Sequence, residues 1–189
     1  APDIYMPEYR MYTTVLDRDS HPVRDLEQRD FRVLEDGVPQ EIVRFERLEN
    51  LPIHVAILLD VSASMESNLA QAKAAALEFF ESAITPKDRG ALIVFNDHPL
   101  LAVKLTNQLP ALAGGLSGLK AERGTSLYDS VVFSLFYFNG IKGQRAILLL
   151  SDGKDEGSRF DVEETLDFAR RAGIAIYTWD VVFRASTVV

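Results

Sequence analysis

The spacing of apolar positions changes partway along the chain, and this change divides it into two parts. In the first part, residues 9–15 and 31–35 alternate between apolar and other side chains, which is typical of half-buried strands. Asp36-Gly37 follows and predicts a hairpin turn, because both central residues of such a turn favour positive φ. A returning strand is expected over residues 38–45. We therefore expect residues 1–50 to form a small attachment of three strands without a hydrophobic core of its own.

Residues 51–189 instead alternate between short apolar runs and amphipathic stretches. The predicted strands cover 54–60, 90–95, 100–105, 144–151 and 174–181, and the predicted helices cover 65–84, 108–119, 127–138 and 161–173. Uninterrupted apolar runs are typical of strands that are buried on both faces. The pattern therefore predicts a three-layer α/β/α domain around a doubly wound, mostly parallel sheet. Residues 100–105 should form one antiparallel edge strand, because the turn before them is too short for a crossover.

Composition and charge exclude several classes of function. The chain has no cysteine, so it can form neither a disulfide framework nor a thiolate zinc site. Its net charge of −8 and its lack of basic runs make nucleic acid a poor partner. No apolar run exceeds five residues, far from the roughly 20 that a membrane span needs. The chain begins at Ala1 without a basic and apolar leader, so we expect either a removed leader or excision from a longer chain.

Three groups of oxygen-bearing side chains fall where predicted strands end or helices begin. Asp60, Ser62 and Ser64 follow the first buried strand, and their alternation places one carboxylate and two hydroxyls on the same side of an extended turn. Gly124-Thr125-Ser126 precedes a helix, and Ser151-Asp152-Gly153 ends another strand. Ligands of open α/β sheets bind at the carboxyl ends of the strands. Carboxylates and hydroxyls are hard donors that suit Mg²⁺, Mn²⁺ or Ca²⁺ and not zinc.

This combination strongly resembles the von Willebrand factor A domain and its metal-ion-dependent adhesion site. The motif of that site is Asp-x-Ser-x-Ser with a distant Thr and a distant Asp, and the matching residues here are Asp60, Ser62, Ser64, Thr125 and Asp152. The surrounding sequences GTSLYDS and LLLSDGKDE also look like those of the family. The resemblance covers about residues 51–181, and residues 17–42 resemble the β segment that precedes this domain in a group of bacterial proteins related to it.

The resemblance implies a metal-dependent protein-binding module for adhesion or complex assembly, not an enzyme. Ser62, Ser64 and Thr125 would bind the ion through their hydroxyls, whereas Asp60 and Asp152 would act partly through bound waters. The sixth ligand would be an Asp or Glu carboxylate from a partner protein, which gains a charge-assisted contact with an incompletely neutralised ion. The supporting or rim residues expected around the site are Asp129, Gly124, Ser151, Gly153 and His98. A secreted or periplasmic location fits such a module, and the oligomeric state stays open.

Other interpretations of the same residues remain. Ser64 could simply cap a helix, although capping requires neither Thr125 nor Asp152. A Mg²⁺-dependent phosphate-ester hydrolase could use Asp60 as nucleophile, but the position two residues later holds Ser62, a poor replacement for an acid–base carboxylate. The domain could also be structural, with a site that does not bind.

Two further expectations concern the acidic loop and the end of the chain. Asp155 and Glu156 are expected to lie in a solvated acidic loop. The family's sheet usually has a sixth strand and a last helix, and residues 183–189 are too short to supply both. We therefore expect either a truncated chain or a different closure of the sheet, with residues 187–189 paired with the β attachment.

Overall fold

The computed structural model describes residues 11, 13, 15, 17, 18, 21, 23–47, 51–180 and 186–188. The chain divides into two compact units, Ala1–Asn50 and Leu51–Val189. Of the strand expected over residues 9–15, positions 9, 10, 12 and 14 lie outside the described residues, and positions 11, 13 and 15 are not in a strand.

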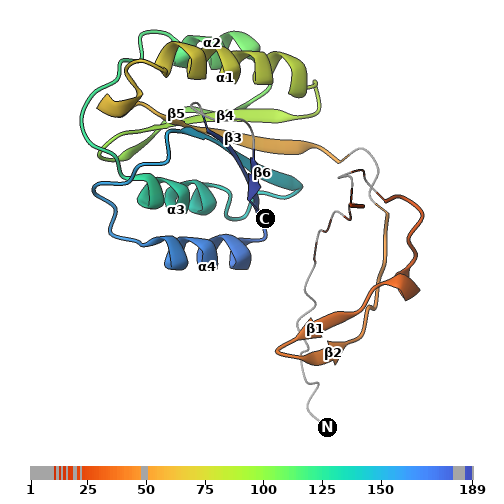
Figure 1. Ribbon diagram of the computed structural model, residues 1–189. Helices are drawn as coiled ribbons and strands as arrows, with labels where there is room; N and C mark the ends of the chain where they lie inside the picture. Colours follow the sequence, from red (N-terminus) through yellow and green to blue (C-terminus); the bar gives the residue numbers. More distant parts are fainter. Residues whose placement is uncertain are drawn as a thin grey trace. The chain divides into compact units, whose positions relative to one another are not determined.

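The first unit contains a short β-hairpin. Strands β1 (Val33–Glu35) and β2 (Val38–Gln40) pair antiparallel, after a 3₁₀ turn η1 (Gln28–Asp30) (Figure 1). Asp36 and Gly37 link them with φ values of +49° and +82°, so the predicted turn is confirmed. No described residue of this unit is buried, which leaves the hairpin with little apolar packing of its own.

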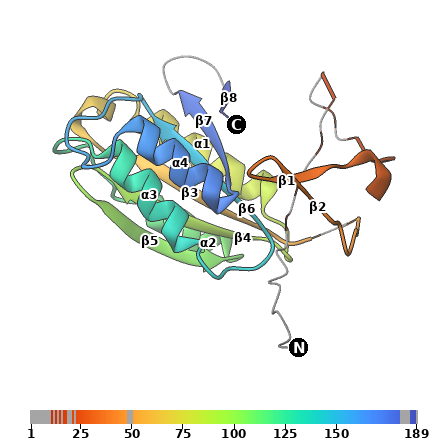
Figure 2. The same ribbon diagram turned by 90° about the horizontal axis from the view of Figure 1, so that it is seen from below.

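The second unit is a six-stranded sheet between two layers of helices, which confirms the predicted α/β class. Its strands are β3 (Ile53–Asp60), β4 (Arg89–Phe95), β5 (Pro99–Thr106), β6 (Gln144–Ser151), β7 (Ala175–Asp180) and β8 (Ser186–Val188). Its helices are η2 (Ala63–Met65), α1 (Leu69–Ala83), α2 (Leu109–Leu116), α3 (Leu127–Tyr137) and α4 (Val162–Ala172). Figures 1 and 2 show α1 and α2 on one face of the sheet and α3 and α4 on the other. No helix in the described part of the chain is long and apolar enough to cross a membrane.

The strand order is β5-β4-β3-β6-β7-β8, so β3 and β6 lie at the centre. Strands β4, β3, β6 and β7 run parallel, and β5 is the predicted antiparallel edge strand. The other edge is also antiparallel, because β8 pairs with β7 through Ile176–Val188 and Thr178–Ser186. The expected pairing of residues 187–189 with the β attachment is therefore wrong for the described residues 187 and 188. A short return onto the free edge of β7 satisfies those backbone groups within the same sheet.

The apolar run of β3 contributes side chains to the core on both faces of the sheet. Ile57 and Leu59 pack on the side of α1 and α2, whereas Ala56 and Leu58 pack on the side of α3 and α4. All four side chains are fully buried. A strand at the centre of a two-faced core needs this uninterrupted run, because neither of its faces meets water.

The start of helix α4 agrees with the sequence pattern, whereas the start of helix α1 does not. Helix α4 begins after Asp161, whose carboxylate and that of Glu164 form the predicted capping box. It ends at Gly173, which has a φ of +59°. Helix α1, in contrast, begins at Leu69 and not at the expected residue 65, because the segment before it forms the separate turn η2.

Asp88 joins the start of β3 to the turn before β4. Its carboxylate accepts hydrogen bonds from the backbone N–H of Ile53 at 2.9 Å and of Thr85 at 3.1 Å, and from the Thr85 hydroxyl. Burial alone would raise the pKa of Asp88. The hydrogen bonds from Thr85 and Ile53 and the nearby Lys87 ammonium outweigh it, so the pKa lies below its usual value of 3.8.

Replacing Asp88 with Asn should destabilise the domain by about 1–3 kcal/mol at neutral pH, because an amide nitrogen then faces backbone donors. The carboxylate contributes this stability above its unfolded pKa and loses it as the pH falls through the lower folded pKa. The difference in unfolding free energy between wild type and Asp88→Asn should therefore shrink between about pH 5 and pH 3, as urea unfolding would measure. Exposed Glu81→Gln serves as control. A difference that stayed constant with pH would contradict this account.

Candidate functional site

The carboxyl ends of β3 and β6 lie side by side at the centre of the sheet. Leu59 pairs with Leu150, so the next residues along each strand, Asp60 and Ser151, are neighbours. The Ser151 hydroxyl donates a hydrogen bond of 2.7 Å to Asp60 Oδ2. The strand register therefore brings together two of the groups predicted from distant parts of the sequence.

Asp60 is fully buried, and both of its carboxylate oxygens are held. Oδ1 accepts a 2.8 Å hydrogen bond from the backbone N–H of Ser62, and Oδ2 accepts the one from Ser151. Burial raises the pKa of Asp60; the hydrogen bonds from Ser62 and Ser151 oppose this, and the charge of Asp152 adds to it. Among the described residues no Lys, Arg or His forms an ion pair with Asp60. The site thus contains a buried carboxylate without a cationic partner.

Ser62 and Ser64 carry the hydroxyls next to this carboxylate. Their Oγ atoms are 3.2 Å apart, and Ser62 is fully buried. Ser64 is half-buried, and its hydroxyl helps to lower the pKa of the nearby Asp152 carboxylate. Hydrogen bonds therefore connect Asp60, Ser62 and Ser64, and Asp152 lies close enough for its charge to act on Asp60.

Asp152 lies in a tight turn that also carries a lysine. Gly153 has a φ of +79°, which a side chain would strain, and its N–H donates to Ser151 Oγ at 3.0 Å. The Asp152 carboxylate accepts a 3.2 Å hydrogen bond from the backbone N–H of Lys154. It also forms an ion pair with Lys154 Nζ at 3.0 Å. Burial acts to raise the pKa of Asp152, but the contacts with Lys154 and Ser64 outweigh it and lower the pKa.

Thr125 reaches the same end of the sheet through its backbone. The residue is buried, and its carbonyl oxygen accepts hydrogen bonds from the N–H groups of Glu156 at 2.9 Å and Gly157 at 3.0 Å. Two residues earlier, the Arg123 carbonyl accepts one from the N–H of Ala63 at 3.0 Å. The backbone of residues 123–125 therefore joins the turn after β3 to the loop that follows Asp152.

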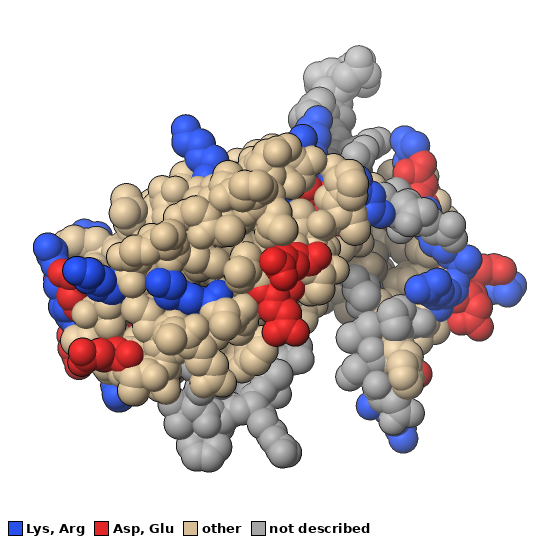
Figure 3. Space-filling view, turned by 90° about the horizontal axis from the view of Figure 1, so that it is seen from above, with Lys and Arg blue, Asp and Glu red and all other residues tan. Residues whose placement is uncertain are grey.

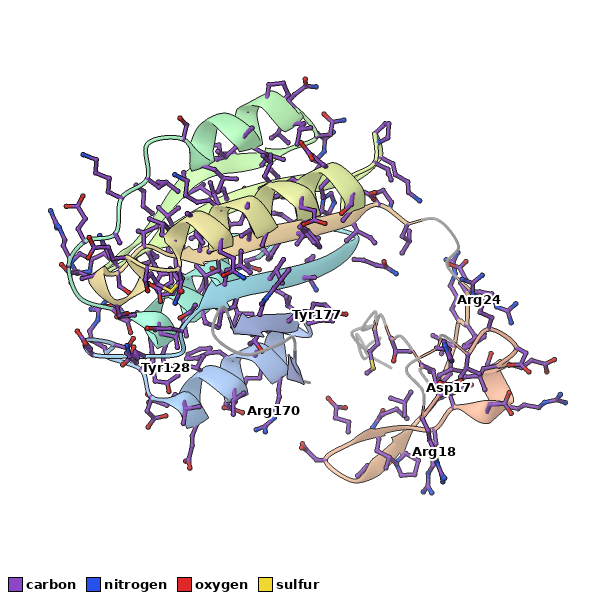
Figure 4. The ribbon with its side chains drawn as sticks, turned by 45° about the horizontal axis from the view of Figure 1, so that its top comes forward. Asp17, Arg18, Arg24, Tyr128, Arg170 and Tyr177 are labelled. Carbon is purple, nitrogen blue, oxygen red and sulfur yellow. The ribbon has the colours of Figure 1, made fainter. Side chains whose placement is uncertain are left out.

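Asp129 anchors the loop between β6 and α4. Its Oδ1 accepts hydrogen bonds from the backbone N–H of Arg159 at 2.8 Å and Phe160 at 3.1 Å, and Oδ2 pairs with the Arg159 guanidinium at 3.4 Å. Burial opposes ionisation, but these contacts lower the pKa of Asp129. In this structure Asp129 thus holds the loop that follows Asp152. Tyr128, its neighbour, lies at the start of α3, near the loops of the site (Figure 4).

Asp97, in the turn between β4 and β5, was not among the predicted site residues. Its Oδ1 accepts the N–H of Gly124 at 2.8 Å, and its carbonyl accepts the Ser126 hydroxyl at 2.6 Å. A Cβ on Gly124 would lie 2.9 Å from that Oδ1, so a larger residue there would displace the Asp97 carboxylate from this contact. In the sequence Asp97 indicates only a turn, and nothing local links it to residue 124. His98 follows it with an exposed side chain.

The expectation for Asp155 is wrong. Its Oδ1 accepts hydrogen bonds from the backbone N–H of Leu127 at 2.8 Å and from the Ser158 hydroxyl at 2.5 Å. Ser126 precedes α3 but makes no capping hydrogen bond with its side chain. Asp155 therefore satisfies an N-terminal N–H of α3 from a distant loop, where a carboxylate also interacts favourably with the helix dipole. Glu156, in contrast, is exposed as expected.

The chemistry of this cluster suits an oxygen-liganded cation. In the described part of the chain, no three His, Cys, Asp or Glu side chains are grouped to hold a metal ion, so any ion here would depend on hydroxyl ligands as well. The cluster offers two carboxylates and the hydroxyls of two serines, with Thr125 beside them. Hard divalent ions accept such mixed oxygen donors.

The fold and the cluster define a class: an α/β domain with a group of oxygen donors at the carboxyl ends of its central parallel strands. A family model, the von Willebrand factor type A domain, matches residues 55–154, more than half of the chain. The chain therefore belongs to the von Willebrand factor type A domain family, whose members commonly mediate protein–protein interactions. No curated protein sequence matches the chain significantly.

Solved structures share this fold at low sequence identity. The conserved hypothetical protein BatB from Bacteroides thetaiotaomicron is 22% identical with a TM-score of 0.58, over 67% of this chain and 65% of that one. The von Willebrand factor domain of the type V pili tip protein Mfa5 from Porphyromonas gingivalis is 21% identical with a TM-score of 0.52, over 57% and 40%. A von Willebrand factor type A protein from Catenulispora acidiphila is 17% identical with a TM-score of 0.56, over 67% and 32%. The chain thus spans less than two thirds of each of these structures.

The role of Asp155 gives a test with a matched neighbour. Asp155→Ala leaves the Leu127 N–H without its acceptor and should destabilise the domain by about 1 kcal/mol. Glu156→Ala removes an equally charged but exposed side chain one residue later and should change stability by less than about 0.5 kcal/mol. Urea unfolding of both variants measures the difference. Equal effects would show that Asp155 does not act as a helix cap.

Proposed function

We propose that this domain is a protein-binding module that captures a partner's carboxylate through a divalent cation, Mg²⁺ or alternatively Mn²⁺ or Ca²⁺. The residues that would hold the ion are Asp60, Ser62, Ser64, Thr125 and Asp152. The observation that carries the proposal is the buried Asp60 carboxylate, which has no cationic partner in the described structure and lies within a network of hydroxyls. A buried charge is unfavourable unless it is paired, and a cation would pair it.

The residues around the proposed ion have distinct roles. Ser62 N–H and the Ser151 hydroxyl fix the orientation of Asp60, so the carboxylate is already placed. Ser64 lies in the turn after β3, and Asp152 lies in the turn after β6. The Ser64 hydroxyl contacts the Ser62 hydroxyl and helps to lower the pKa of Asp152. When bound, the ion would supply the positive charge that a partner's Asp or Glu carboxylate requires. No bond is broken in such a mechanism.

The expectation of a protein partner agrees with the family and with the distribution of charge on the surface. Figure 3 shows the face that carries α1 and α2, where basic side chains are scattered and form no continuous patch in the part that is visible. With a net charge of −8, this favours a protein partner over nucleic acid. One structural relative is a pili tip protein, which supports our proposal that this domain acts outside the cytoplasm, either secreted or in the periplasm.

The geometry disfavours the alternative of a phosphate-ester hydrolase. A hydrolase that uses Asp60 as nucleophile would need an acid–base group beside it. Ser62, two residues later, is itself fully buried and has no ionisable group. A purely structural domain remains the second candidate, and metal binding distinguishes it.

Calorimetric titration with Mg²⁺ and Mn²⁺ tests the metal site directly. Wild type should bind one ion, and Asp60→Asn and Thr125→Val should weaken the affinity by at least about tenfold. The first substitution removes the negative charge of a ligand, and the second removes a hydroxyl ligand, both at nearly constant shape. Ser67→Ala, which changes an exposed serine three residues after Ser64, should bind like wild type. Saturating ion should also raise the unfolding temperature of wild type, because a ligand that binds only the folded state stabilises it.

Stability without metal separates loss of a ligand from loss of the fold. In EDTA, Asp60→Asn should be at least as stable as wild type, because it removes a buried charge whose pKa is raised by burial. Identical metal affinities of wild type and Asp60→Asn would contradict the proposed site. Unchanged wild-type unfolding temperatures with and without millimolar Mg²⁺ would favour a structural domain.

Partner capture should depend on the same residues. Immobilised domain should retain a partner from an extract of its source cells in Mg²⁺ and release it in EDTA, and Thr125→Val should retain little of it. Ser67→Ala should behave like wild type. A partner that stays bound in EDTA, or that Thr125→Val captures equally well, would show that binding uses another surface.

A further inference from the structure

Lys154 places a positive charge on one of the two carboxylates of the site. Its Nζ lies 3.0 Å from Asp152 Oδ2, and its backbone N–H donates to Oδ1 of the same carboxylate. Only 7% of the Asp152 side chain is exposed, so most of its surroundings are protein, whereas the Lys154 side chain is 59% exposed. The contact therefore joins a fixed carboxylate to a side chain that can leave it.

The turn keeps this lysine close to its partner. Gly153 in the left-handed conformation folds the chain back between Asp152 and Lys154, and Ser151 Oγ holds the Gly153 N–H. The ammonium group is therefore tethered two residues from the carboxylate at any concentration of metal. Asp60, the other carboxylate, has no such partner in the described structure.

We propose that Lys154 is a tethered competitor for the cation: it neutralises Asp152 when the site is empty and must withdraw when an ion binds. This inference rests on the proposed function and refines it by assigning control of metal affinity to this chain's own lysine. An ion beside Asp152 would compete with the Lys154 ammonium for the Asp152 carboxylate. The two positive charges would also repel each other. The exposed four-carbon stem of Lys154 allows the ammonium to turn away into solvent.

The competition makes an unusual prediction, because removal of a side chain next to the site should improve binding. Calorimetric titration of Mg²⁺ and Mn²⁺ should show that Lys154→Met binds about three- to tenfold more tightly than wild type, since an exposed ion pair no longer has to break. Lys154→Arg keeps the charge and should bind within about twofold of wild type. Lys120→Met, which removes an exposed lysine elsewhere, controls for the change in net charge.

The outcomes separate the two proposals. If Lys154→Met and Lys120→Met bind metal with the same affinity as wild type, the competition is overturned while the metal site stands. If Lys154→Met binds more weakly, Lys154 supports the ion and the competition is likewise overturned. If none of the four proteins binds either ion while all unfold cooperatively, both this inference and the proposed function are overturned.

Discussion

The arrangement of this domain depends on one buried carboxylate. Asp60 ends the central strand β3, where both faces of the sheet are covered, so its carboxylate has no exposure to bulk solvent. Ser62 N–H and the Ser151 hydroxyl replace part of that hydration. These two donors come from the turn after β3 and from the end of β6. The carboxylate therefore constrains the path of the chain at the centre of the sheet.

Hydrogen bonds between loops extend this constraint outward. Asp97 holds Gly124 and Ser126, Asp155 caps α3, and Asp129 fixes the loop before α4. Each of these acidic residues accepts backbone or hydroxyl donors from a segment distant in sequence. Part of the acidic composition of the chain thus has a structural use, because carboxylates satisfy the N–H groups that irregular loops leave without partners.

Sequence was sufficient where one local rule decides the structure. The apolar run of β3, the Asp36-Gly37 turn and the capping box at Asp161 each follow from neighbouring residues alone. It was insufficient for Asp97 and Asp155, because an acceptor for a distant N–H has no local signature. The pairing of β8 with β7 could not be predicted for the same reason. A three-residue strand has too few residues to show an apolar pattern, and its position depends on which edge of the sheet is free.

The two carboxylates of the cluster show how position controls charge. Asp60 ends β3, and Asp152 follows the adjacent strand β6. The charge of Asp152 acts on Asp60, yet burial raises the pKa of Asp60 while the contacts of Asp152 lower its own pKa. The difference arises because Asp152 lies in a turn that returns Lys154 to it, whereas Asp60 is held only by neutral donors. Neutral donors orient a carboxylate without cancelling its charge. One carboxylate thus keeps an uncompensated attraction for a cation, and the other has its charge already paired.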